Sequence, residues 1–114
     1  MILRAGDKVR ITKDAFENNE YDIVVIATKG SIGKVLSYSE YCDHIHKIGA
    51  GYSQEYFSYV KTSIDGGTQY PIRFVKVVMP PKNFCDDLEG NGPVYMGCKV
   101  RRVYLLGIQF LEKI

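Results

Sequence analysis

Two stretches decide the fold that the sequence predicts: AGDKVRI at residues 5–11 and GSIGKV at residues 30–35. In the first, polar and apolar residues alternate after a Gly-Asp turn, which is typical of a strand with one buried face. In the second, two glycines allow positive φ and close backbone approach before an alternating strand resumes. Together they predict two strands at the corner of a tightly curled sheet.

Further strands are expected on both sides of these two. The continuous β-branched run at residues 23–28 predicts a strand buried on both faces, and the polar segment 13–22 before it predicts an exposed loop. Near the C-terminus, residues 96–111 are rich in Val, Leu, Ile and Phe and predict either one bent strand or two. Gly107 is the expected bend.

Residues 70–77 alternate in the same way and predict another strand, ended by the prolines that follow Met79. Pro71 cannot donate a hydrogen bond to a neighbouring strand, so we expect it at a sheet edge or at the start of its strand. The side chains expected to be buried are Ile72, Phe74 and Val77.

The segment at about residues 39–65 interrupts the strand pattern and predicts a partly helical insertion. Apolar residues at helical spacing, followed by Gly49, predict one short helix, and Ser53 can cap a second. The apolar residues of the first helix are Tyr41, Ile45 and Ile48. Those of the second are Tyr56, Phe57, Val60 and Ile64.

The chain has 114 residues, 46% of them hydrophobic and 25% charged, which is ordinary globular composition and excludes disorder. We therefore expect a mainly β protein: one small barrel of five to six antiparallel strands spanning residues 1–114. It would carry the helical insertion and a C-terminal β extension from about residue 82 to 114. No apolar run is long enough to span a membrane, and no signal peptide is recognisable, so we expect a cytoplasmic protein.

The two stretches that decide the fold resemble SH3-like barrels, whose strands often read Gly-Asp-x-Val-x-Ile and Gly-x-x-Gly-x-Val. Within that superfamily the chain is similar to KOW modules and to the peripheral stromal subunit of photosystem I. For the latter, YPIRFVKV at residues 70–77, followed by Asn83 and Phe84, resembles the last strands. The resemblance implies a small barrel that binds a protein complex or a nucleic acid.

Aromatic residues are concentrated around the insertion, where six of the fourteen lie within 22 residues. Tyrosine rings bury area at low entropic cost and often dominate binding energy at contact surfaces. They favour a non-catalytic docking or accessory module of a larger complex, although the rings would also serve simply to fill the core. The protein-contact candidates are Tyr38, Tyr41, Tyr52, Tyr56, Phe57 and Tyr59.

The charge balance is nearly even, with 15 Lys and Arg against 13 Asp and Glu, far from the excess that phosphate backbones demand. One basic cluster near the C-terminus nevertheless makes a KOW-like nucleic-acid-binding module the alternative function, because barrels bind single strands with basic stripes. Its candidate residues are Arg73, Lys76, Lys99, Arg101 and Arg102.

A metal-binding role ranks third and rests on CDHIH at residues 42–46, where Cys42, His44 and His46 are the candidate ligands. A strand would place all three on one face, whereas a helix would bring together only Cys42 and His46. A fourth ligand would have to come from Cys85 or Cys98. Three cysteines without a close pair favour free thiols, and no catalytic motif or cofactor signature is recognisable. Self-association through an exposed strand edge is left open.

Overall fold

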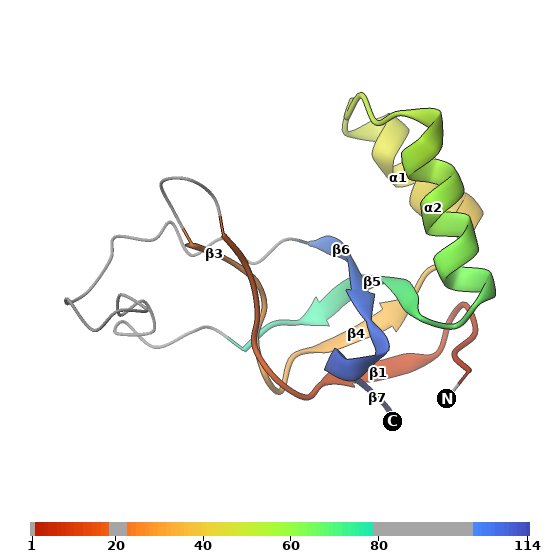
Figure 1. The fold of residues 1–114 in the computed structure, drawn as a ribbon. Coiled ribbons are helices and arrows are strands. Elements are labelled where there is room, and N and C mark those ends of the chain that lie inside the picture. The colour runs from red at the N-terminus through yellow and green to blue at the C-terminus, as the bar shows by residue number, and fades with distance from the viewer. Residues whose placement is uncertain (1, 19–22, 79–101) are drawn as a thin grey trace.

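Five strands form one curled antiparallel sheet in the computed structural model, which describes residues 2–18, 23–78 and 102–114 (Figure 1). Their order across the sheet is β6-β5-β4-β1-β7, so β6 and β7 are its two edges. The strands are β1 (Lys8–Ile11), β4 (Ile32–Val35), β5 (Gln69–Lys76), β6 (Val103–Gly107) and β7 (Leu111–Lys113). The predicted β fold with a helical insertion and a C-terminal strand is confirmed.

Strands β2 (Ala15–Asn18) and β3 (Ile23–Ala27) form a separate two-stranded ribbon, which extends from the sheet on the side away from the helices (Figure 1). The prediction of an exposed loop before β3 was therefore wrong over Ala15–Asn18. Its polar residues pair by their backbones with the β-branched β3, and this pairing needs no apolar alternation. Ile26 and Ala27 are both buried, as expected of a strand covered on two faces.

The main core lies inside the curl of the sheet, where Val9, Ile11 and Ile72 are completely buried. The glycine turn between β3 and β4 works as predicted, because Gly30 adopts a φ of +87°. A Cβ at Gly33 would collide with the Ile72 side chain and lie 3.0 Å from the Arg73 carbonyl oxygen, so glycine lets β4 and β5 approach closely.

Two expectations for β5 need correction. Val77 lies just beyond the strand and is 37% exposed, because the sheet no longer covers it there. Pro71 is not at a sheet edge, since β5 lies between β4 and β6. It is also not the first residue of its strand, which begins at Gln69. Its carbonyl accepts from the Leu36 N–H just beyond the end of β4, so its missing N–H forgoes only the reciprocal bond to the Leu36 carbonyl.

The C-terminal segment forms two strands, β6 and β7, joined by a 3₁₀ turn at Ile108–Phe110. Gly107 stands at the bend, as predicted. The turn leads the chain from one edge of the sheet to the other, so that Leu111 pairs with Ile11.

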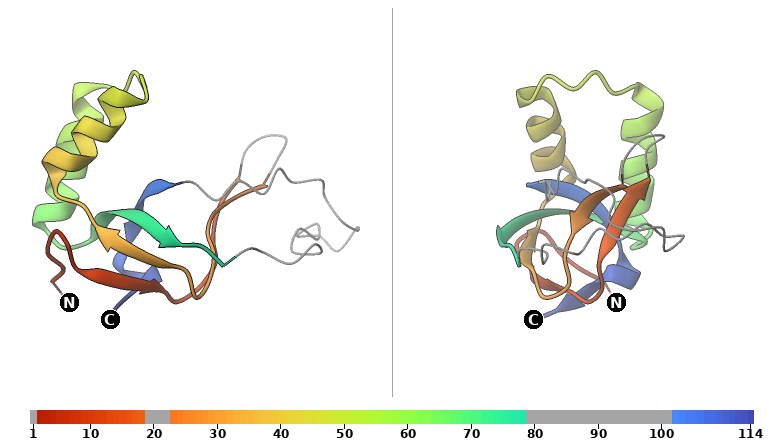
Figure 2. Two further views of the ribbon diagram at one scale, coloured as in Figure 1. Left: turned by 180° about the vertical axis from the view of Figure 1, so that it is seen from behind. Right: turned by 90° about the vertical axis from the view of Figure 1, so that its left-hand side faces the viewer.

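The insertion forms two helices, α1 (Tyr38–Lys47) and α2 (Gln54–Asp65), which stand on the same side of the sheet (Figure 2). Ser37 caps α1 in a reciprocal capping box with Glu40, and Ser53 caps α2 as predicted. Ile48 was expected on the buried face of α1, but it lies at the C-cap and is 59% exposed. No helix within the described residues is long and apolar enough to cross a membrane.

This helical hairpin packs on the outer face of β5 and β6 through a second, smaller hydrophobic cluster. Its buried members are Tyr41, Ile45 and Val60, and Val103 and Leu105 of β6 pack against them. The hairpin cluster therefore covers the outer side of β6 at Val103 and Leu105, whereas Val75 of β5 remains 57% exposed. The hairpin thus lies next to β6, which is an edge strand of the described sheet.

Candidate functional site

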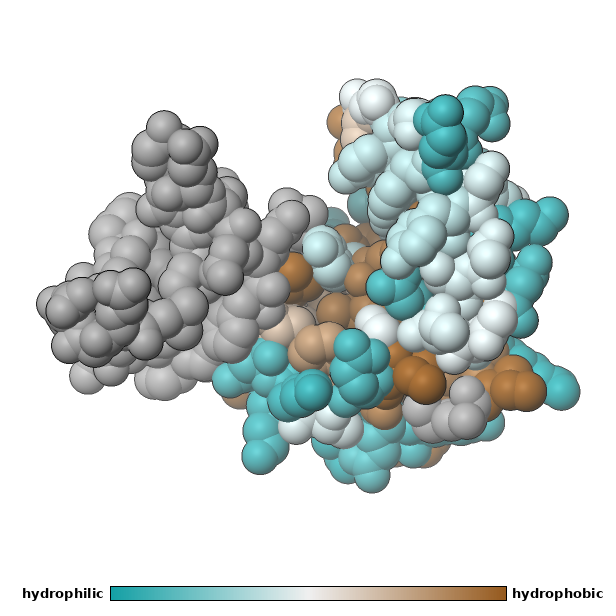
Figure 3. Space-filling view, in the orientation of Figure 1, coloured by the Kyte–Doolittle hydropathy of each residue, from teal (hydrophilic) through white to brown (hydrophobic). Residues whose placement is uncertain are grey.

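A groove of about 1750 Å³ lies between the helical hairpin and the β5–β6 end of the sheet. One side is formed by α1, another by Tyr52 and the first two turns of α2, and the floor by β5, β6 and Arg102. Hydrophobic residues gather in the hollow below and beside the hairpin (Figure 3). Its volume exceeds the roughly 300–1,000 Å³ of typical small-molecule sites, so it has room for a larger ligand.

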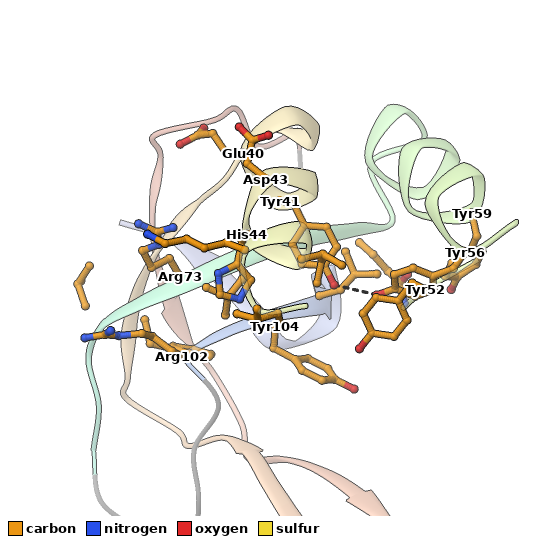
Figure 4. A pocket seen from close by; sticks show the side chains of 18 residues that line it. Glu40, Tyr41, Asp43, His44, Tyr52, Tyr56, Tyr59, Arg73, Arg102 and Tyr104 are labelled. Carbon is orange, nitrogen blue, oxygen red and sulfur yellow. Dashed lines mark hydrogen bonds between the residues drawn. The ribbon is translucent and has the colours of Figure 1, made fainter. Parts of the chain in front are cut away.

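Four of the predicted contact tyrosines line this groove (Figure 4). Tyr41 is buried, and its hydroxyl lies 2.8 Å from that of Tyr56. Burial, followed by this hydrogen bond, raises the pKa of Tyr41 well above its ordinary value, so its hydroxyl stays protonated. Tyr52 stacks on Tyr56 with ring centroids 4.4 Å apart. Tyr52 and Tyr59 remain 45% and 54% exposed, which leaves these two rings accessible to a partner.

The other two aromatic candidates, Tyr38 and Phe57, lie elsewhere. With Cys42 and His46 they line a smaller hollow on another side of the hairpin. The Phe57 ring stacks on His46 at 5.8 Å between centroids. A hydrogen bond with Cys42 is the main cause that raises the pKa of Tyr38. These aromatic residues hold the helices together rather than face the groove.

The predicted metal ligands are divided by the helix. Cys42 and His46 lie one turn apart in α1 and share the smaller hollow, whereas His44 lines the groove. The arrangement on a strand, which would have put all three on one face, does not occur. In the part of the chain that the structure describes, no three His, Cys, Asp or Glu side chains are grouped as metal ligands would be. Cys85 and Cys98 lie outside that part.

One end of the groove is charged, with Arg73, Arg102 and His44 near Glu40 and Asp43 (Figure 4). Hydrogen bonds from Ser37 in the capping box, chiefly from its backbone N–H, lower the pKa of Glu40. Burial, followed by the positive charges of Arg73 and Lys47, lowers the pKa of His44, so His44 favours its neutral form.

The two guanidinium groups of this end form no salt bridge with any residue in the described ranges. Arg73 and Arg102 come from adjacent strands, where the Phe74 N–H donates to the Arg102 carbonyl. Of the other predicted basic residues, Lys76 is exposed at the end of β5 and does not line the groove. Lys99 and Arg101 lie outside the described residues. Of the predicted basic stripe, only Arg73 and Arg102 are found together among the described residues.

The outer edge of β6 also faces the groove, and sequence patterns alone gave no sign of it. Residues 102–105 all line the groove, although successive side chains of a strand point to opposite faces. The lining alone does not show an exposed edge, because Arg73, Phe74 and Val75 of the interior strand β5 line the groove as well. It is the strand order that makes β6 an edge of the described sheet, so its outer side lies beside the groove. Gln69 lines the same groove, and its side-chain oxygen is buried without a hydrogen-bond partner in the described structure. A buried acceptor of this kind is uncommon.

Comparisons with known proteins place the chain in no group: no family model matches it, and neither a curated protein nor a solved structure resembles it significantly. Any function must therefore be argued from the groove itself.

Proposed function

We propose that this chain is a non-catalytic docking module of a larger complex and that the groove beside β6 binds a segment of a partner protein. The observation that carries the proposal is the pairing of two exposed tyrosines, Tyr52 and Tyr59, with an open strand edge in one hollow. Tyrosine rings that become buried on binding are typical of the positions that dominate protein-protein binding energy.

The chemistry of the groove favours binding over catalysis. The hydroxyl of Tyr41 stays protonated and is engaged with Tyr56, and Glu40 is engaged in the capping box. Among the described residues that line the groove there is no Ser, Thr or Cys that His44 could activate as a general base. The groove thus offers aromatic surface, backbone groups and the cations of Lys47, Arg73 and Arg102.

We further assign the barrel to the SH3-like class. The curled five-stranded antiparallel sheet, with its last strand beside its first, supports that assignment. So do the roles of Gly30 and Gly33, the glycines that carry the sequence resemblance. The fold class does not itself specify a function, which rests on the groove.

A nucleic-acid ligand is the competing interpretation, because Arg73 and Arg102 lie beside tyrosines on which bases could stack. Lys47 lines the groove with these two arginines, and three cations are few for phosphate-backbone binding, in which affinity grows with the number of neutralised phosphates. We therefore favour protein and let the experiment decide.

The test is affinity capture from native lysate with the wild-type chain, a Tyr52→Ser/Tyr59→Ser variant and an Ile2→Ser/Ile114→Ser control. Both pairs are exposed, so neither should disturb folding. We expect one protein partner that survives nuclease, is retained by the control and is lost with the tyrosine variant. Loss of every partner on nuclease treatment, together with binding that falls steeply with salt, would replace docking by nucleic-acid binding.

A further inference from the structure

We propose that the groove binds an extended segment of another protein as an added strand on β6, with a carboxylate of that segment beside Arg73 and Arg102. The inference rests on the proposed docking function and specifies how the partner is held. Addition of a strand to a free sheet edge gives affinity through main-chain hydrogen bonds and specificity through alternate side chains.

The direction of the backbone groups in β6 follows from two recorded bonds. The Phe74 N–H donates to the Arg102 carbonyl, and the Ile108 N–H donates to the Thr68 carbonyl. The backbone N–H and C=O groups of the even-numbered residues of β6 therefore point toward β5. Because N–H and C=O alternate in direction along a strand, those of Val103 and Leu105 point away from the sheet. No hydrogen bond links them to any described residue. These four groups, which have no partner among the described residues, are a template for a further strand.

The surroundings of this edge define the side chains that the added strand should carry. Every second side chain would face the hairpin, where Ile48, Tyr52 and Tyr59 are exposed, and should be apolar or aromatic. At the other end, the guanidinium groups of Arg73 and Arg102 form no salt bridge in the described chain, although the charge of Arg73 contributes to lowering the pKa of Glu40. Arg binds carboxylates in a bidentate manner, which predicts Asp or Glu at that end of the segment.

A second copy of this chain fits the same edge less well. Residues 102–107, RVYLLG, contain no carboxylate, so β6 of another copy brings no partner for the two arginines. Edge-to-edge pairing of two β6 strands would also bring two helical hairpins together, because each hairpin packs on its own β6. A single extended segment fits beside the hairpin and supplies the missing charge.

The first step of the test is to select ten-residue segments from a displayed random library on the wild-type chain. Binders retained by the Tyr52→Ser/Tyr59→Ser variant are discarded, so that only groove-dependent peptides remain. We expect alternating apolar residues with Asp or Glu near one end. For the best peptide, the Arg73→Gln/Arg102→Gln variant should bind about tenfold more weakly, the scale of one charged hydrogen bond. A peptide in which that Asp or Glu is replaced by Asn or Gln should bind the wild-type chain and the Arg73→Gln/Arg102→Gln variant equally.

The second step removes one outward backbone donor without changing a side chain. Chemical ligation at Cys98 joins residues 1–97 to a synthetic 98–114 segment and leaves the native sequence. Methylation of the Leu105 backbone nitrogen blocks the added strand and leaves the ladder to β5 intact. We expect about tenfold weaker peptide binding, from one lost hydrogen bond and a steric block. The matched control is methylation at Lys113, which points outward from the opposite edge, and should change affinity less than twofold.

The outcomes separate the two proposals. If groove-dependent peptides bind equally well to the Leu105-methylated chain, docking stands and the added strand is refuted. If the selection yields no peptide sensitive to the tyrosine variant, the docking function itself is refuted. If the unmodified chain forms a dimer that Leu105 methylation dissociates, the edge belongs to a second copy and the proposal is wrong.

Discussion

The two edges of the sheet are built in opposite ways. At β7 the edge is three residues long and charged: Glu112 pairs with Arg10 and Lys113 with Asp7, each at 3.6 Å. At β6 the edge is five residues long, VYLLG, without a charge, and lies beside an aromatic hairpin. Natural sheets shield their edges with short strands and charges, because unpaired backbone groups attract other strands. This protein shields one edge and leaves the other open.

The difference also reflects how each edge is supported. Leu111 of β7 is part of the main core, so that edge is fixed by the same contacts that hold the sheet together. Leu106 anchors β6 in the main core as well, but the groove depends on the small hairpin cluster around Val60. We expect the β6 side to open more readily, as elements with fewer buried contacts do.

The largest effect is expected from Leu111→Ala, because Leu111 is buried in the main core. The lost side chain and the cavity should lower the free energy of unfolding by about 3 kcal/mol. Denaturant titration measures this, with exposed Ile114→Ala as the control that should change little. The folded fraction should keep wild-type affinity for the groove peptide. Weaker peptide binding would show that the two edges are coupled.

A smaller loss, about 2 kcal/mol, is expected from Val60→Ala, which creates a cavity beneath the hairpin. Here the effect should be local, so amide hydrogen exchange should quicken in α1 and α2 before β1 and β4. Lys61→Ala, the exposed neighbour in α2, is the matched control. Uniform loss of protection across the sheet would contradict the view that the hairpin forms a separate unit.

Replacement of Gln69 by Met should stabilise the free protein by about 1 kcal/mol, because it removes a buried oxygen that has no partner in the described structure. Gln54→Met, at the exposed start of α2, provides the control in thermal unfolding. If the oxygen accepts a hydrogen bond from the docked segment, the same variant should weaken peptide binding. Destabilisation of the free protein would instead mean that Gln69 already has a partner.

Acidification should weaken the groove side of the fold through His44. Its pKa is lowered from 6.5 by burial and by Arg73 and Lys47, so the unfolded chain binds a proton at higher pH than the folded chain. The contribution of neutral His44 to the free energy of unfolding is complete above pH 6.5, and it is lost as the pH falls through the pKa of His44 in the folded chain. His44→Gln should flatten that part of the stability profile. His46→Gln serves as the comparison, and an equal flattening there would remove the assignment to His44.

Much of the fold behind these two edges could be predicted from local sequence. The alternation at residues 8–11, the glycines at 30 and 33 and the cap at Ser53 act over a few residues, so the strands, the turn and the second helix were correctly predicted. Strand β2 was missed because its pairing with β3 is supplied by the partner strand rather than by its own pattern. The contact aromatics were predicted as one group, but helical geometry directs Tyr38 and Phe57 away from the groove.

The open edge could not be predicted, because no local pattern says which strand ends a sheet. The residues of β6 read as a buried strand whether or not a neighbour follows. Only the strand order shows that Val103 and Leu105 lack a partner strand on one side within the part of the chain that the structure describes. The same holds for the buried oxygen of Gln69, which depends on packing across the sheet. Arg73 and Arg102, by contrast, were predicted as members of one basic cluster, and the register of β5 and β6 brings them onto adjacent strands.

The smallest change in stability is expected at the β7 edge. Its ion pairs are largely exposed, and such pairs contribute about 0.5 kcal/mol or less, so Glu112→Val/Lys113→Val should scarcely alter the free energy of unfolding. If the charges serve to repel strands, the variant should nevertheless self-associate, which sedimentation velocity would detect. The Glu112→Gln/Lys113→Gln variant, whose side chains are uncharged but still polar, separates the effect of lost charge from the effect of added apolar surface. If the Glu112→Val/Lys113→Val variant stays monomeric, an uncharged apolar edge is not sufficient to attract a strand. Binding at β6 would then depend on the aromatic hairpin beside it and not merely on the absence of charge.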